Sequence, residues 1–335
     1  MATRERRPAK TWSLIGDVKR KPSNYEVTAA KFHYHFRRDP APFELDPQTP
    51  INQWYVKYRE GSPFNVDDWE QFRDPHKLTY TDYVALQHGR ETYLDLLIDQ
   101  HEATNAVADL DPAWVDTLRR LYVPARFPLH VLQITGLYVG QMAPSSFITN
   151  CSNFQAADEM RRVQRIAYWT KVLSNAHGED LAATSTARTQ WEDDEAWQPL
   201  REAAEQLLTA HDWGEAFTAL NLALKPAVDT LLNWQFAELA RANEDDFLTL
   251  LFSDFQLDSK RSQDWTAALV RYALERRPEL RDVLTGWLET WQPRATKAVE
   301  SLAPIFNTAP RPTPADQVVD AMGEQCRAFL DSCGL

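Results

Sequence analysis

Glycine and cysteine are both scarce in this sequence, and each scarcity disfavours particular folds or binding sites. Only 10 of 335 residues are glycine. Tight hairpin turns commonly require glycine at positive φ, so this composition favours helices over a hairpin-rich β fold. The three cysteines, Cys151, Cys326 and Cys333, form no Cys-x-x-Cys pair. The sequence therefore predicts neither a disulfide framework nor a zinc site, and it indicates a reducing compartment.

The chain also lacks features of membrane and nucleic-acid proteins. The N-terminus has no apolar signal region, and the most apolar stretch, residues 127–143, contains His130, Gln133 and Gln141. That stretch is too short and too polar to cross a bilayer. The net charge is −12, which disfavours contact with phosphate backbones. We expect a cytoplasmic protein that binds neither membranes nor nucleic acid; the basic residues before Pro22 are interpreted as a solvated or partner-docking arm.

Recognisable catalytic motifs are missing as well. A carboxylate di-iron site takes Glu-x-x-His from two helices, but none of the eight histidines has glutamate three residues earlier. His33-x-His35 and the His88/Glu91 pair are weak metal patterns, and ordinary hydrogen-bonding histidines are the favoured interpretation. There is no Gly-x-Ser-x-Gly, phosphate-binding loop or dinucleotide fingerprint. The residues alone thus predict a helical protein with no catalytic site.

Residues 1–75 differ from the rest of the chain. They contain eight of the 20 prolines and many aromatic residues, without helical or alternating periodicity. Proline excludes long regular elements here, yet the segment is too apolar for a disordered tail. We expect an extended arm that packs on its own helical body, on another subunit, or on both. The candidate docking residues are Trp12, Tyr25, Phe32, Tyr34, Trp54, Tyr55 and Tyr58.

Long helices are predicted from about residue 78 onward. Periodicity and capping signals place them at about 81–108, 112–142 with a kink near Pro124 and Pro128, 146–177, 189–210, 212–242, 244–276 and from Pro278 onward. Asp212 with Glu215 predicts a capping box, and residues 192–195 an acidic helix start. Thr313-Pro314 opens a last short helix. The predicted organisation is a 1–75 arm, a 76–305 all-α long-helix bundle and a 306–335 tail.

Three stretches extend this interpretation through a resemblance. They are residues 20–26 with 50–59 and 74–80, residues 138–146 with 150–159, and residues 212–217 with 220–226. Together they resemble the β subunit of the hydroxylase component of bacterial multicomponent monooxygenases of the toluene and alkene type. The similarity extends from about Thr11 to about Trp291. It implies a ferritin-like fold, shared with the paralogous α subunit of that component.

The resemblance also implies a degenerate metal site, because only the family's α subunit keeps the di-iron ligands. Its two Asp-Glu-x-Arg-His signatures correspond to residues 158–162 and 258–262. The six ligand positions fall on Leu129, Glu159, Arg162, Lys225, Ser259 and Ser262, so five of the six are lost. Leucine, lysine and arginine offer a cation no lone pair at neutral pH. We expect one or both of Arg162 and Lys225 to pair instead with Glu159 or Asp158 inside the bundle.

For function, the resemblance implies a hydroxylase built as a dimer of αβγ heterotrimers. Its α subunit would activate O2 at a di-iron centre and oxidise an aromatic or an alkene. Electrons would come from NADH through a reductase and a Rieske ferredoxin, with a small effector protein completing the system. The present chain would be the structural subunit, without catalytic residues or cofactor. The alternatives are a free-standing helical interaction protein and, less favoured, an active di-iron oxidase.

Overall fold

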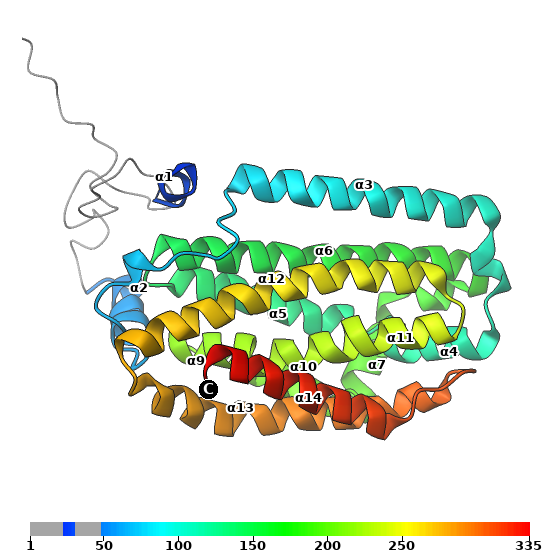
Figure 1. The fold of residues 1–335 in the computed structure, drawn as a ribbon. Coiled ribbons are helices and arrows are strands. Elements are labelled where there is room, and N and C mark those ends of the chain that lie inside the picture. The colour runs from blue at the N-terminus through cyan, green and yellow to red at the C-terminus, as the bar shows by residue number, and fades with distance from the viewer. Residues whose placement is uncertain (1–22, 31–47) are drawn as a thin grey trace, which may run out of the picture.

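The computed structural model describes residues 23–30 and 48–335, and in those residues it contains helices and no strand. The long helices are α3 (Tyr80–Thr104), α5 (Arg126–Met142), α6 (Ser146–His177), α12 (Asp246–Arg276), α13 (Leu280–Leu302) and α14 (Ala315–Cys333). They lie roughly side by side, with α3 outermost on one side and α13 on the other (Figure 1). The all-α, long-helix prediction is confirmed. None of the described helices is both long enough and apolar enough to cross a membrane.

Helix α6 follows its predicted bounds, 146–177, because both ends carry strong local signals. The Ser145 side chain accepts a hydrogen bond from the backbone N–H of Phe147 at 3.2 Å. Gly178 follows the last turn at φ 118°, a conformation that few other residues adopt. Its inward face mixes apolar residues with polar ones, and it buries the charged side chains of Asp158, Glu159 and Arg162. Helix α6 therefore carries charged groups into the interior.

The chain from Trp213 to Ala242 forms one nearly continuous helix with two wider π-helical segments. Its parts are α9 (Trp213–Phe217), η7 (Thr218–Leu224, π), α10 (Lys225–Asp229), η8 (Thr230–Gln235, π) and α11 (Phe236–Ala242). Asp212 caps its start by accepting hydrogen bonds from the N–H groups of Gly214 and Glu215 at 2.9 and 3.1 Å. The predicted capping box is only half formed, because Glu215 accepts from Trp291 Nε1 at 3.2 Å instead.

Two predicted helices are interrupted in the structure. The expected helix at 189–210 is split into α7 (Thr184–Asp193) and α8 (Gln198–Leu207), so the acidic run at 192–195 ends one helix instead of starting one. Asp194 accepts from the N–H of Ala196 at 3.0 Å and stabilises the turn between them. The expected 112–142 helix is divided into α4 (Pro112–Leu121) and α5 by a turn at Pro124, which matches the predicted kink.

The C-terminal helix is longer than expected. Helix α14 has 19 residues, and it buries Val318, Met322, Phe329 and Cys333 against the bundle. Short 3-10 segments complete the body: η5 (Ala106–Asp109), η6 (Glu179–Leu181) and η9 (Ala303–Thr308). Residues 315–333 are thus packed as one further helix of the bundle.

The described part of the N-terminal segment packs on the bundle. It forms short helical pieces: α1 (Asn24–Ala30), α2 (Pro50–Tyr55), η3 (Val56–Glu60, π) and η4 (Trp69–Gln71, 3-10). Phe64 is fully buried, with ring centroids 5.3 Å from Trp213 and 5.9 Å from Phe217. Trp69 lies edge-on to Trp213 at 5.4 Å. The aromatic side chains of residues 64–72 therefore belong to the hydrophobic core.

Candidate functional site: a buried ion cluster

Four charged side chains meet in the interior of the bundle. Glu159 and Arg162 come from α6, and Lys225 and Asp229 come from α10, the α-helical piece between the two π segments. None is more than 4% exposed. The i, i+3 spacing on α6 and the i, i+4 spacing on α10 place each acid and base of a helix on the same face. The two facing helices thus each contribute one positive and one negative charge.

Each acid of this ion cluster contacts both bases. Arg162 Nη1 donates to Glu159 Oε2 at 2.7 Å and to Asp229 Oδ1 at 2.8 Å. Lys225 Nζ donates to Asp229 Oδ2 at 2.8 Å and also to Glu159. The ion cluster is electrically neutral, which is what burial of charge requires. The predicted pairing of Arg162 and Lys225 with Glu159 is confirmed.

Polar groups of α12 and the second π segment extend the ion cluster. Asn233, on η8, accepts from Arg162 Nη2 at 3.0 Å through its Oδ1 atom. Its amide nitrogen donates to Ser259 Oγ of α12 at 2.7 Å. Lys225, Asp229 and Asn233 are spaced four residues apart, so one stripe of this mostly buried helix carries all three. The hydrogen bonds therefore connect three helices of the bundle.

The surroundings keep both basic residues and Asp229 charged. Burial disfavours the charge on Lys225, but Asp229 and Glu159 outweigh it and raise the lysine pKa. Burial likewise opposes the charge of Arg162, and the same two carboxylates raise its pKa. For Asp229, Lys225 and Arg162 overcome the effect of burial and lower the pKa. Mutual pairing thus holds the ionised forms in place at neutral pH.

The six positions that the resemblance assigns to metal ligands do not fit a di-iron centre. Glu159, Arg162 and Lys225 share the ion cluster, with Ser259 joined to it through Asn233. Ser262 donates to Gln155 at 2.7 Å in a neighbouring amide network, and Leu129 is a fully buried core residue. The two carboxylates of the ion cluster have basic partners where iron would require open lone pairs. Across residues 23–30 and 48–335, no group of three His, Cys, Asp or Glu side chains could hold a metal ion.

A second charged network lies between α3, α6 and α12, and the sequence did not reveal it. Arg90 of α3 binds Asp254 at 2.9 Å and also contacts Asp258, both on α12. Arg161 of α6 binds Asp258 at 2.9 Å. Asp158, the other expected partner for Arg162 or Lys225, instead accepts from Arg261 at 2.5 Å. We name these residues, with Tyr83 and Gln87 of α3, the α3 network.

Asp158 is the carboxylate of the α3 network whose charge is least favoured. Burial and the neighbouring Asp258 raise its pKa to about 7, against the opposing effect of Arg261. Tyr83 Oη and Gln87 Nε2 donate to its Oδ1 atom at 2.8 and 2.7 Å. Gln87 Nε2 also donates to Asp258 Oδ1 at 3.0 Å. Two carboxylates therefore share donors, and one of them takes up a proton near neutral pH.

The predicted docking residues of the arm that lie in the described part contact the chain's own body. Tyr25 is 5% exposed, with its ring 5.7 Å from Phe147 of α6. Trp54 Nε1 donates to Tyr138 Oη at 3.0 Å, and the Trp54 and Tyr58 rings lie against His211. Trp54, Tyr55 and Tyr58 remain half-buried. Trp12, Phe32 and Tyr34 lie outside the described residues.

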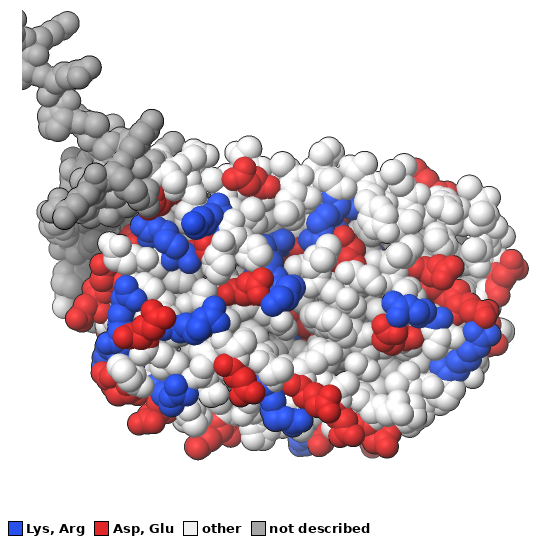
Figure 2. Space-filling model, in the orientation of Figure 1, with Lys and Arg blue, Asp and Glu red and all other residues white. Residues whose placement is uncertain are grey.

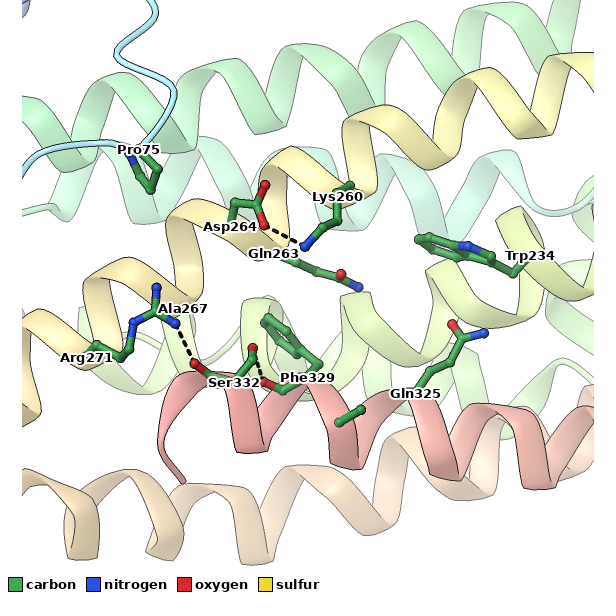
Figure 3. Close-up of a pocket in the computed structure, with 11 residues that line it drawn as sticks. Pro75, Trp234, Lys260, Gln263, Asp264, Ala267, Arg271, Gln325, Phe329 and Ser332 are labelled. Atoms are coloured by element: carbon green, nitrogen blue, oxygen red, sulfur yellow. Dashed lines mark hydrogen bonds and ion pairs between the residues drawn. The ribbon is translucent and has the colours of Figure 1, made fainter.

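A surface groove of about 530 Å³ between α12 and α14 is not a second site of this kind. Figure 3 shows Lys260 paired with Asp264, and Arg271 bound to the backbone of α14 at Ser332. Because both cations already have partners within the chain, the groove offers no unpaired charge for a ligand. The ion cluster is the more informative feature for function.

The helical arrangement and the ion cluster together define a long-helix bundle protein in which buried ion pairs connect the helices. A family model for methane/phenol/alkene hydroxylases matches residues 54–277. The chain belongs to that family, as a β subunit of the hydroxylase component of a multicomponent monooxygenase. The resemblance seen in the sequence is thereby confirmed.

Individual relatives support this placement. The hydroxylase component subunit beta of the toluene-4-monooxygenase system of Ectopseudomonas mendocina is 38% identical over 308 residues, covering 92% of this chain and 94% of that protein. The small hydroxylase subunit of propane 2-monooxygenase from Rhodococcus jostii (strain RHA1) is 28% identical, covering 87% and 82%. A chain in a solved structure of toluene 4-monooxygenase superposes with a TM-score of 0.83 at 38% identity, covering 90% of this chain and 99% of that one. A chain of phenol hydroxylase from Pseudomonas sp. OX1 shares the fold at the same TM-score and 19% identity, covering 100% and 98%.

Proposed function

We propose that this chain is the non-catalytic scaffold of its hydroxylase, which supports a separate di-iron α subunit in a dimer of αβγ heterotrimers. The observation that carries the proposal is the ion cluster. Arg162 and Lys225 stand at positions that the resemblance assigns to metal ligands, and they neutralise Glu159 and Asp229. The chain thus supplies from its own side chains the positive charge that a metal supplies in a related bundle.

The proposed division of labour follows from this charge balance. The α subunit would carry the iron, the O2 chemistry and the substrate pocket, and would oxidise an aromatic or an alkene. Electrons would reach it from NADH through a reductase and a Rieske ferredoxin, with a small effector protein. The present chain would contribute rigidity, because its ion cluster and the α3 network connect α3, α6, α10 and α12. Its cytoplasmic location is part of the same proposal.

Metal analysis of the separated subunits tests the proposal. The chain and the α subunit encoded with it are co-expressed in iron-supplemented medium, purified together, and then separated. We expect iron in the α fraction, with about two ions per α chain, and only background iron in this chain. About two irons per β chain, or no complex with the α subunit, would overturn the proposal.

A further inference from the structure

In its middle, over residues 84–93, helix α3 turns polar side chains inward and several apolar side chains outward. Arg90 and Gln87 point into the α3 network between α6 and α12. By contrast, Tyr80, Val84 and Leu96 are 62%, 45% and 63% exposed. A helix on the surface of a soluble protein normally has the opposite arrangement, with its apolar stripe toward the core. The outer face of α3 is therefore unusual for a surface that only meets water.

The middle of this outer face carries no charge. None of the exposed residues between positions 84 and 93 is Asp, Glu, Lys or Arg, although these four types make up a quarter of the chain. In Figure 2 the surface over α3 is largely white for the same reason. Leu86 and Tyr93 of the same stretch are 39% and 44% exposed. Contiguous apolar surface of this kind marks protein interfaces.

Gly89 lies in the middle of this face and has no side chain. A Cβ atom built on Gly89 would have no heavy atom within 4 Å, so the fold of this chain does not require glycine there. Glycine in a helix interior is destabilising relative to alanine. With Ala85 one turn earlier, Gly89 removes side-chain bulk between Leu86 and Tyr93. Small residues at such a point let a second helix approach closely, ridge into groove.

From these observations we infer that the outer face of α3, centred on Ala85 and Gly89, is the docking surface for an uncharged, apolar helix of the α subunit. The inference rests on the proposed function, which supplies that partner. Charge favours a different chain over a second copy, because each copy has a net charge of −12 and two copies would repel. The α3 network holds the helix from beneath, so the surface is rigid before the partner arrives, which lowers the entropy lost on binding.

The test is the substitution Gly89→Leu, with Gly286→Leu as its matched control. Gly286 is also an exposed glycine inside a long helix, α13, and a Cβ there would likewise meet no atom within 4 Å. Because leucine is the better helix former, neither substitution should lower the thermal midpoint of the isolated chain. We expect Gly89→Leu to reduce the amount of α subunit that co-purifies with the tagged chain at least tenfold. Gly286→Leu should leave that amount unchanged.

The outcomes separate the inference from the proposed function. If the wild-type chain retains the α subunit and Gly89→Leu retains it equally well, the docking surface lies elsewhere and the proposed function stands. If the wild-type chain retains no α subunit, the proposed function itself fails. Light scattering of the isolated chain tests whether a second copy of the chain covers this face instead. If the chain is a dimer that Gly89→Leu converts to monomers, a second copy covers the face and the inference is overturned.

Discussion

Lys225 is the side chain whose removal tests the ion cluster most directly. In Lys225→Met the side chain keeps its length and loses its charge, which leaves Glu159 and Asp229 to share Arg162. One negative charge is then uncompensated among side chains that are at most 1% exposed. Breaking a buried pair in this way costs about 3–5 kcal/mol of unfolding free energy. We expect a similar loss for Glu159→Leu, which leaves an uncompensated positive charge.

The double variant Glu159→Leu/Lys225→Met should be much milder than the sum of the single variants. It keeps the Arg162–Asp229 pair, at 2.8 Å, and restores neutrality. Replacement of a buried ion pair by apolar side chains of similar size is often close to neutral. The interaction free energy of the double-mutant cycle should therefore be at least about 2 kcal/mol.

Chemical denaturation followed by far-ultraviolet circular dichroism measures these free energies, provided that the slope with denaturant stays constant. The exposed Arg201–Glu205 pair on α8 is the matched control, with side chains 30% and 60% exposed. Arg201→Met and Glu205→Leu should interact by no more than about 0.5 kcal/mol. Additive effects below about 0.5 kcal/mol at Glu159 and Lys225 would refute a buried, mutually dependent ion cluster.

Three further predictions concern other parts of the chain. The pKa of Asp158 is raised from its ordinary value of 3.8 to about 7, so between these pH values the folded state holds a proton that the unfolded chain has lost. The free energy of unfolding should therefore fall as the pH rises through this window, by up to about 1.4 kcal/mol per pH unit. The Asp158→Asn variant should not show this fall. Equal pH profiles of stability for the wild-type chain and the variant would contradict the prediction. Gly214→Ala should destabilise the chain by about 1–3 kcal/mol, because the new Cβ would lie 2.6 Å from the Phe64 Cβ. The control Gly286→Ala meets no such contact and should stabilise the chain by about 0.4–1 kcal/mol. Equal denaturation midpoints for the two variants would exclude the close approach at Gly214. Deleting residues 1–46 should leave the helical circular dichroism largely intact but weaken co-purification with the α subunit, and unchanged assembly would mean that this segment serves only its own chain.

Local signals in the sequence were enough to predict the long helices. Ser145 and Gly178 enclose α6, so both of its ends could be predicted. The break between α7 and α8 was missed because apolar residues continue across it. Trp191 and Trp197 are both buried, although Trp191 lies in α7 and Trp197 is the residue that precedes α8. The periodicity of apolar residues indicates which face of the chain is buried. A tight turn can end a helix and still leave the residues on both sides of the turn buried.

Contacts between helices were harder to predict than the helices themselves. The resemblance identified Glu159, Arg162 and Lys225, but it gave no role to Asp229. The available signal was the repeat Lys225, Asp229, Asn233, three polar residues four apart on an otherwise buried helix. The α3 network gave no such signal, because salt-bridge partners on different helices depend on which helices are neighbours. The π-helical segments also escaped prediction, since one extra residue per turn leaves the composition unchanged.

The ion cluster has a consequence for how the protein is made in the cell. In proteins that fold around a metal, ligand carboxylates remain uncompensated until the ion is delivered, and folding is coupled to the supply of that ion. Here Arg162 and Lys225 are translated as part of the same polypeptide as Glu159 and Asp229. Their charges can be balanced as soon as α6 and α10 pack together. Balancing these four charges therefore requires no metal ion, and under the proposed function a folded scaffold would be ready during iron starvation, before iron reaches the α subunit.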